Sequence, residues 1–440
     1  MAPVMRVQWW SKMGDDEQRQ LFDRGLAAIF SPELKVSIGR IIDDVRDNGD
    51  EAVCRALRDF DGVDLSPDQL RVSTSEFEAA RSKVDDSVVV AIVDAIEHLQ
   101  SFNRQLMERH GDWRFETEPG LFAGEKVTPI ASAGLFCPSG KASYPSVLCQ
   151  LGTPARVAGV PTVAVVVPPV PGTAGAVDPA VLVVADELGL ADVFRVNGPA
   201  GIAALAFGTE TIPKVVKVVG PGSPAVTCAQ IEVQRYGVST MMLLGPSEAL
   251  ILADDSADPV RLAADLLNEA EHGTDSSVVL VTDSETLVAA VEGELAKQIA
   301  VLPGPRFDAA SAALGRNGGC VIVRSIDEGI EVANRYGPEH MQVATSDPEA
   351  TLELLVNAGE ILLGQHTAIS AANFIIGCPA SLPTSGFANV SSGITVDAFL
   401  KRTAVARANE AAMRRMALNV IALAEHEGFP AHANAARIRL

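Results

Sequence analysis

The stretch VTPIASAGLFCPSG, residues 127–140, marks where the sequence changes from helical patterning to short β-rich runs broken by glycine and proline. Four similar runs follow it, at residues 162–167, 181–185, 193–196 and 215–219. Residues 200–207, between the last two runs, have a helical pattern. Apolar strands separated by helices are typical of a parallel sheet covered on both faces. We therefore predict one α/β unit over residues 136–247.

A second series of alternating elements begins near residue 249. Strands are predicted at residues 249–252, 277–282 and 319–323, and helices at residues 259–272 and 285–300. This pattern indicates another α/β unit, to which we assign residues 29–135 and 248–394.

The two ends of the chain are predicted to be helical. Residues 15–60 have apolar positions at helical spacing, and residues 1–28 are assigned to an N-terminal helical arm. Residues 395–440 form a C-terminal tail with an alanine-rich helical stretch over residues 397–427. The tail is long for a segment that packs on its own domain, so we expect it to pack on a second copy of the chain.

The composition excludes several classes of protein. The 440 residues carry 35 basic and 56 acidic side chains, and the net charge of −21 opposes binding to nucleic acid. The six cysteines include no CxxC pair, and the first 18 residues have one arginine and no apolar core. The most apolar stretch, residues 157–190, is interrupted by five prolines, so its runs are too short to cross a bilayer. We predict a cytoplasmic protein that binds neither nucleic acid nor membranes.

The sequence LLNEAEHG, residues 266–273, ends a predicted helix that begins at Asp258 and Pro259. Glu269 and His272 are three positions apart, so their side chains lie on one helix face and can bind the same metal ion. The alternative is a solvated helix end whose histidine offsets the helix dipole.

Two further segments carry titratable groups of interest. Glu339 and His340 follow a bend at Pro338, and histidine is the natural base near neutral pH. The alternative for this pair is a surface loop. His432 lies in EGFPAH near the C-terminus, where a solvated histidine is the alternative.

Two glycine-containing turns are candidates for phosphate binding. Residues 198–201 (GPAG) and 220–223 (GPGS) each follow a β-like run, but neither matches the GxGxxG fingerprint. Their backbone N–H groups either face a pyrophosphate or belong to plain tight turns.

Nine segments together resemble the histidinol dehydrogenases, zinc enzymes that use two NAD molecules to convert an amino alcohol through an aldehyde to a carboxylate. The segments are PARVAGV, IAALAFGT, GPGS, LLGPSEALILAD, LLNEAEHGTDS, NRYGPEH, LPTSGF, FLKRT and EGFPAH, in the family's order and spacing. The resemblance covers nearly the whole chain. It implies two incomplete Rossmann-like domains with small terminal segments, and an intertwined homodimer whose tails complete each other's sites. It also implies Zn²⁺ and NAD as cofactors, with NADP as the alternative dinucleotide.

The resemblance also implies a set of metal ligands, at Glu269, His272, Asn373 and His432. The family has glutamine where this chain has Glu269, and aspartate where it has Asn373. The two differences offset each other, because one adds a carboxylate and the other removes one. The set still supplies two imidazoles, one carboxylate and one amide, which favours a divalent ion.

By the same resemblance, Glu339 orients or activates water and His340 is the general base. Ser247 and Glu427 correspond to substrate contacts, and Ala380 stands where the family has a histidine near the substrate's imidazole. Three positions that contact NAD are also altered: the family's tyrosine, glutamine and asparagine correspond to Phe136, Ala200 and Ser223. The loss of a partner for a buried imidazole N–H costs about 1–3 kcal/mol, enough to change substrate preference.

The sequence supports three functional hypotheses. The first is a zinc- and NAD(P)-dependent dehydrogenase that keeps the family's machinery and oxidises a different small polar alcohol. The second is an authentic L-histidinol dehydrogenase of histidine biosynthesis. The third is a dimer that binds metal without turnover, which the intact Glu339–His340 pair opposes.

Overall fold

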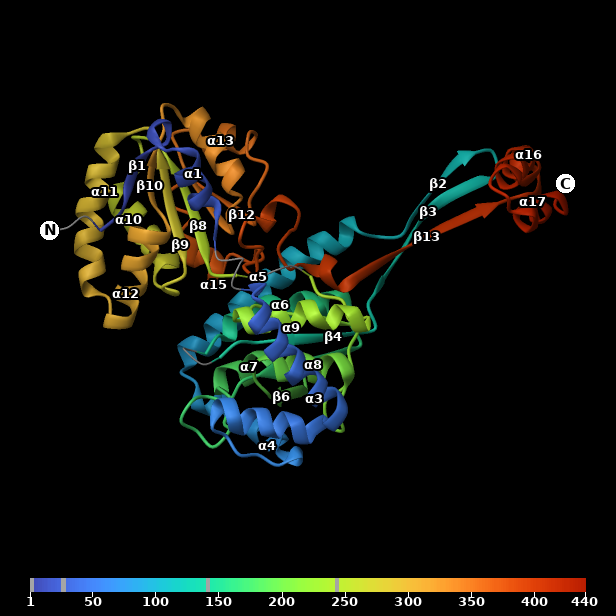
Figure 1. Cartoon of the computed structure of the whole chain (residues 1–440), viewed down its shortest axis with the longest axis horizontal. Helices are drawn as coiled ribbons and strands as arrows, with labels where there is room; N and C mark the ends of the chain where they lie inside the picture. Colours follow the sequence, from blue (N-terminus) through green and yellow to red (C-terminus); the bar gives the residue numbers. More distant parts are fainter. Residues whose placement is uncertain (1–3, 25–28, 140–142, 242–244) are drawn as a thin grey trace.

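The computed structural model describes residues 4–24, 29–139, 143–241 and 245–440. Two parallel sheets, each covered by helices, lie next to each other, and an antiparallel sheet projects from them (Figure 1). The predicted α/β class with two Rossmann-like units is confirmed, and both ends of the chain contain helices. The predicted N-terminal helical arm is wrong for residues 7–9, which form a strand of the larger sheet. Residues 1–3 and 25–28 of the predicted N-terminal arm lie outside the described residues.

The larger sheet has six strands, all of them parallel. In spatial order they are β1 (Val7–Trp9), β10 (Gly319–Ile322), β9 (Ser277–Thr282), β8 (Glu248–Ala253), β11 (His340–Ala344) and β12 (Glu360–Leu363). Alternate residues of β8 enter two different cores, which is the period-2 pattern of a strand buried on both faces.

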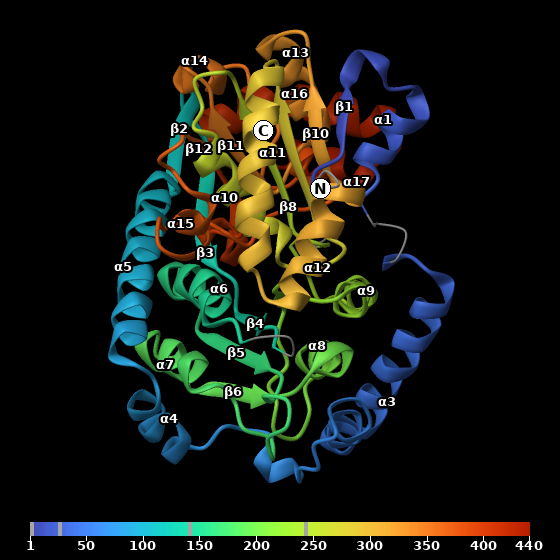
Figure 2. The same ribbon diagram turned by 90° about the vertical axis from the view of Figure 1, so that its left-hand side faces the viewer.

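Helices cover both faces of this sheet. One face packs on α10 (Pro259–Ala270), α11 (Glu285–Gln298), α12 (Gly304–Ala312) and α15 (Ile369–Phe374). The other face packs on α1 (Asp15–Phe22) and α13 (Ile326–Tyr336), and the short α14 (Pro348–Leu352) lies between β11 and β12 in the chain. Figure 2 shows α11 and α12 in front of the larger sheet, with the smaller sheet below.

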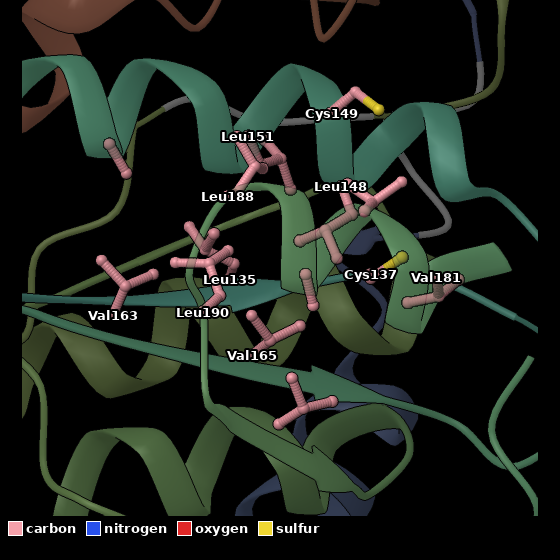
Figure 3. Close-up of a cluster of buried hydrophobic side chains, with 14 of the residues drawn as sticks. Leu135, Cys137, Leu148, Cys149, Leu151, Val163, Val165, Val181, Leu188 and Leu190 are labelled. Atoms are coloured by element: carbon pink, nitrogen blue, oxygen red, sulfur yellow. The ribbon is translucent and has the colours of Figure 1, made fainter. Parts of the chain in front are cut away.

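The smaller sheet has four parallel strands. Their order is β6 (Asp192–Arg195), β5 (Thr162–Val167), β4 (Ser132–Phe136) and β7 (Lys217–Val219). One face packs on α5 (Asp86–Arg109), α6 (Pro145–Ala158) and α7 (Pro179–Glu187), with α4 (Thr74–Ala80) against α7. The other packs on α3 (Pro32–Ala56), α8 (Gly198–Phe207) and α9 (Pro224–Val233). Figure 3 shows the first core, in which Leu135 and Val165 of the sheet face Leu148 and Leu151 of α6.

Helices from the segment 29–135 pack on the smaller sheet, which differs from the predicted assignment of this segment to the larger unit. α3 packs against α8 and α9, and α5 packs against α6 and α7. The sequence pattern identified these helices by their spacing, which does not specify the sheet that their apolar faces cover.

One predicted strand is a helix. Residues 181–185, VLVVA, lie inside α7, although valine-rich runs are typical of strands. The Asp178 side chain accepts a hydrogen bond from Ala180 N at 2.7 Å, and Pro179 occupies the first turn, so the helix has a capped start. A short apolar run does not distinguish a buried strand from a buried helix, and here the cap decides.

The projecting sheet joins two distant parts of the chain. It consists of β13 (Leu400–Ala408), β3 (Leu121–Pro129) and β2 (Trp113–Glu118), all antiparallel. The prediction that residues 397–427 are entirely helical is therefore wrong for β13, which pairs along its whole length with a strand nearly 280 positions earlier. α16 (Glu410–His426) and α17 (Pro430–Arg437) follow at the far end (Figure 1). Within the described residues, no helix has the length and hydropathy of a membrane span.

Candidate active site

Two of the predicted metal ligands meet at the C-terminal end of α10. The Asp258 side chain caps the start of this helix by accepting a hydrogen bond from Val260 N at 2.9 Å, as the sequence predicted. Glu269 lies in the last turn and His272 just beyond the C-cap Glu271, and His272 Nδ1 lies 3.1 Å from Glu269 Oε2. The Glu269 side chain is fully buried, whereas that of His272 is 45% exposed. The alternative of a wholly solvated helix end is therefore excluded for Glu269.

Asn373 and Ser247 complete this cluster. Asn373, on α15, donates a hydrogen bond from Nδ2 to Glu269 Oε1 at 2.7 Å, and Asn268 donates to the same oxygen at 2.8 Å. Ser247 Oγ lies 2.8 Å from His272 Nδ1. The second carboxylate oxygen, Glu269 Oε2, is buried and has no hydrogen-bond partner in the described part of the chain.

This donor set suits a divalent cation. Burial raises the pKa of Glu269, but the charges of His272 and His340, together with the hydrogen bonds from Asn373 and Asn268, lower the pKa overall. An ionised carboxylate with an uncommitted oxygen, an imidazole and an amide oxygen are groups that bind zinc. No three His, Cys, Asp or Glu side chains of the described residues form such a cluster, because the third group here is the amide of Asn373. A closed four-ligand site therefore needs a donor from outside the cluster.

The predicted catalytic pair lies at the start of β11. α13 ends at Gly337, whose φ of 55° reverses the chain, and Glu339 and His340 follow with only 9% and 3% exposure. The surface-loop alternative is therefore wrong. Glu339 Oε2 accepts a hydrogen bond from Glu248 N at 2.9 Å, and Glu339 Oε1 lies 3.8 Å from His340 Nε2. The other ring nitrogen, His340 Nδ1, is 2.5 Å from Glu360 Oε1.

Burial and mutual charge shift the pKa of both members of the pair. Burial raises the pKa of Glu339 to about 8; the charge of His340 opposes this shift and that of Glu269 adds to it. Burial lowers the pKa of His340, but the charge of Glu269, the hydrogen bond with Glu360 and the charge of Glu339 raise it overall to about 10. The site thus surrounds one imidazole with three carboxyl groups, and a bound cation would offset this excess of negative charge.

A buried ion pair supports Glu339 from behind. Arg24 Nη1 lies 2.8 Å from Glu248 Oε2, and the guanidinium lies over the Tyr336 ring at 3.8 Å from its centre. Ser385 donates from its backbone N to Glu248 Oε1 at 2.7 Å with a φ of 55°, a conformation that costs energy for a residue with a side chain. Burial raises the pKa of Glu248 to about 7. Because Glu248 N donates a hydrogen bond to Glu339, this network connects the N-terminal segment to the predicted catalytic pair.

The three predicted cofactor residues line one cavity of about 220 Å³ beside the smaller sheet. Phe136 is the last residue of β4, Ala200 lies in the first turn of α8, and Ser223 is the N-cap of α9. Both glycine turns thus lead into helix N-termini at this cavity, where backbone N–H groups favour anions. Gly220 has a φ of 139°, and a Cβ there would lie 2.1 Å from Phe136 O, so glycine is required for the close approach.

The remaining predicted residues are dispersed. Ala380 follows α15 and donates its backbone N to Gln150 Oε1 of α6 at 3.0 Å. Glu427 caps the end of α16 and His432 lies on α17; both are exposed. Figure 1 shows these two helices at the far end of the projecting sheet, away from α10 and α15. One chain therefore brings Glu269, His272 and Asn373 together but not His432.

Comparison with known proteins identifies the family of this chain. Residues 28–440 match the family model described as histidinol dehydrogenase. The chain belongs to the histidinol dehydrogenase family. The histidinol dehydrogenase homolog of Colwellia psychrerythraea is 40% identical over 90% of this chain and 88% of its own length. The histidinol dehydrogenase of Rhizobium meliloti is 38% identical over 95% of this chain and 96% of its own.

A solved structure shows the same fold over the whole chain. The crystal structure of histidinol dehydrogenase from Elizabethkingia anophelis matches with a TM-score of 0.94 at 30% identity, covering 100% of this chain and 98% of that one. Histidinol dehydrogenases are NAD-dependent oxidoreductases that act on CH–OH groups and use Zn²⁺. The expected cofactors are thus confirmed at the level of the family.

Three residues of this histidinol dehydrogenase-like site were not found from the sequence: Glu360, Glu248 and Arg24. Glu248 is the first residue of a fully buried strand, EALILA, and Glu360 the first of a partly buried one, EILL. The sequence feature that could have identified them is a single acidic residue at the start of an apolar run. Such a residue is expected to be buried, and a buried charge needs a specific partner. Arg24 carried no such signal, since its partners lie more than 220 positions away.

Proposed function

We propose that this protein is a zinc- and NAD-dependent dehydrogenase that oxidises a small polar alcohol. The observation that carries the proposal is the buried Glu339–His340 pair beside a carboxylate, an imidazole and an amide that converge. Glu269, His272 and Asn373 would hold the metal, and His432 would come from a second copy of the chain. Phe136, Ala200 and Ser223 would line the NAD site.

Zinc would supply a Lewis acid for the alcohol oxygen, and NAD would supply the hydride acceptor. His340 would take the hydroxyl proton at Nε2, because Nδ1 is already hydrogen-bonded. Glu339 would hold water or the substrate through Oε1, since Oε2 is occupied by Glu248 N. Ser247, next to His272, would orient the substrate at the edge of the cluster.

The electrostatics support a link between metal and base. A histidine with a pKa of about 10 is protonated at neutral pH, whereas a general base must be neutral. A cation at Glu269 would neutralise the carboxylate that contributes most to this rise, which favours the neutral imidazole. The same residues without the ion would be poor at accepting a proton.

Ala380 supports an alcohol other than L-histidinol, because its methyl side chain offers no hydrogen bond to an imidazole. The second candidate is an authentic L-histidinol dehydrogenase, supported by relatives of that name at 38% identity over nearly the whole chain. Relatives named as homologs match at 40% identity, so identity alone favours neither candidate.

A substrate screen tests the proposal and separates the candidates. Zinc-loaded protein is incubated with NAD and amino, sulfo and sugar alcohols, including L-histidinol, and NADH is followed by absorbance. We expect one alcohol other than L-histidinol to be oxidised faster than L-histidinol. Rapid turnover of L-histidinol would support the second candidate instead. Stoichiometric zinc without turnover of any alcohol would support the third hypothesis, a metal-binding dimer.

We further propose that two copies of the chain share each site. The exposed apolar side chains Leu418 (69%) and Leu423 (64%) on α16 favour packing against another chain. Separate His272→Ala and His432→Ala proteins should each lack zinc at this site. After the two are unfolded and refolded together, half of the dimers would be mixed and each would hold one intact site, so zinc should recover to about a quarter of the native content. No recovery in refolded, dimeric mixtures would contradict a shared site.

A further inference from the structure

We propose that Glu360 is a positioning residue for His340: it holds the imidazole in the tautomer with the proton on Nδ1 and leaves Nε2 to accept the substrate proton. This inference rests on the proposed role of His340 as the general base. Glu360 itself would not touch the substrate.

Sheet register places the two side chains side by side. His340 is the first residue of β11 and Glu360 the first of β12, and the two are direct partners in the parallel ladder. Partners in a parallel ladder project to the same face, so their side chains meet. The result is a contact of 2.5 Å between Glu360 Oε1 and His340 Nδ1, with both side chains buried.

The burial of the Glu360 carboxylate costs free energy, and its contact with His340 offsets part of that cost. Its Oε2 is buried without a hydrogen-bond partner within the described residues, so His340 is the only described side chain that satisfies this carboxylate. An apolar residue would fill the start of β12 at lower cost. The position of the acid is therefore explained by its effect on the histidine.

The contact decides which ring nitrogen carries the proton. An ionised carboxylate only accepts hydrogen bonds, so Nδ1 must donate and the neutral ring keeps its lone pair on Nε2. Nε2 lies 3.8 Å from Glu339 Oε1, too far for a hydrogen bond, and remains available to a substrate. The carboxylate also stabilises the imidazolium that forms once the proton has moved.

The charged groups around His340 come from four parts of the chain. Glu360 lies on β12, Glu339 directly before β11, Glu269 on α10 and Glu248 on β8. Of these, only Glu360 is hydrogen-bonded to the ring, so its removal has an effect on the tautomer that removal of the others does not have.

The test is a nitrogen-15 NMR titration of the histidine rings in the full-length protein as purified, with its zinc content measured. The His340 signals are identified by their loss in His340→Gln. In the native protein we expect neutral His340 to be protonated on Nδ1. In Glu360→Gln we expect the pKa of His340 to fall by about 1–3 pH units. A form protonated on Nε2 should also appear, because an amide can donate to Nδ1. Glu360→Asp should restore the native tautomer.

Two controls separate a positioning role from a structural one. Glu232→Gln changes another buried glutamate, on α9 with Lys35 and Arg235 as partners, and should leave the His340 titration unchanged. Zinc content in Glu360→Gln should equal the native content. An unchanged pKa and tautomer in Glu360→Gln, or native His340 protonated on Nε2, would overturn the inference.

The NMR result and the turnover result test different claims. With an alcohol that is oxidised, Glu360→Gln should shift the acidic limb of the kcat/KM profile to lower pH. Absence of turnover in the native protein would contradict the proposed function, whereas an unchanged His340 in Glu360→Gln would contradict the role of Glu360.

Discussion

The two parallel sheets place their candidate functional groups at opposite edges. In the six-stranded sheet, Glu248, His340 and Glu360 are the first residues of their strands, so the charged cluster lies at the amino edge. In the four-stranded sheet, the cavity lies beyond the last residues of the strands, between Phe136 and the starts of α8 and α9. A carboxyl-edge site is the common arrangement in open α/β sheets, and an amino-edge site is not.

Helix direction explains the difference. At the carboxyl edge the crossover helices begin, and their N-termini present N–H groups that favour an anionic dinucleotide. At the amino edge they end, and the negative C-terminal end of α10 favours a cation beside Glu269 and His272. We infer that the chain uses helix N-termini in one sheet to bind an anion and a helix C-terminus in the other sheet to bind a cation. Substitutions that remove a charged group should then have large effects at the amino edge of the larger sheet. At the cavity, substitutions that change its shape should have the larger effects.

The largest effect is expected for His340→Ala at the charged edge. Turnover of the best alcohol should fall about 10²–10⁴-fold, because the general base is lost. Zinc content should stay near the native value, whereas the melting temperature should fall, because Glu360 loses the described side chain that satisfies its buried carboxylate. His366→Ala, an exposed histidine elsewhere on the larger unit, is the matched control. Turnover within a factor of two of native would exclude His340 as the base.

A large effect on stability is expected for Arg24→Met. Removal of one partner of a buried ion pair costs about 3–5 kcal/mol of unfolding free energy when the other stays charged. Burial raises the pKa of Glu248 from 4.5 to about 7, so its contribution to stability is fully present below pH 4.5 and lost as pH rises through 7. Without Arg24 the pKa of Glu248 rises further. The loss of unfolding free energy in Arg24→Met, relative to the native protein, should therefore be larger at pH 8.5 than at pH 5.5.

Urea unfolding at both pH values measures this deficit. In the double variant Arg24→Met/Glu248→Gln, which has no ionisable group at Glu248, most of the pH dependence should disappear. A deficit of equal size at pH 5.5 and 8.5 in Arg24→Met would show that packing, not charge, is lost.

At the cavity, Gly220→Ala should act through shape. The new Cβ would overlap Phe136 O and the positive φ is unfavourable, so the turn must move. We expect KM for NAD to rise about tenfold or more, which is the effect of losing about 1.4 kcal/mol of binding. Gly293→Ala on α11, where a Cβ meets open space, is the control and should leave KM unchanged. A native KM for NAD in Gly220→Ala would show that this turn does not contribute to NAD binding.

The smallest effect is expected for Ser223→Asn. This change introduces the amide that the resemblance to the family implies at this position, and one added hydrogen bond contributes about 0.5–1.5 kcal/mol. KM for NAD should fall about 2–12-fold with kcat unchanged, as measured by initial rates at varied NAD. An increase in KM would show that Ser223 lies outside the cofactor contact.

The sequence predicted the local parts of this molecule better than their long-range partners. The capped helix with Glu269 and His272 and the turns at Gly198 and Gly220 depend on neighbouring residues, and the structure contains them. The contact of Glu360 with His340 depends on the register of two strands, which spacing along the chain does not reveal.

The tail shows the same limit at a larger scale. Residues 400–408 have an alanine-rich composition that favours a helix, but pairing with β3 makes them a strand. Tertiary pairing outweighs intrinsic propensity here. It also places α17, and with it His432, at the far end of the projecting sheet.

The projecting sheet has a consequence for the timing of activity. The helices α16 and α17, with which Glu427 and His432 are associated, lie away from α10 and α15 of the same chain (Figure 1). If two copies share each site as proposed, a freshly synthesised chain would stay inactive until it paired with a second copy. Its specific activity would then depend on protein concentration and fall on dilution.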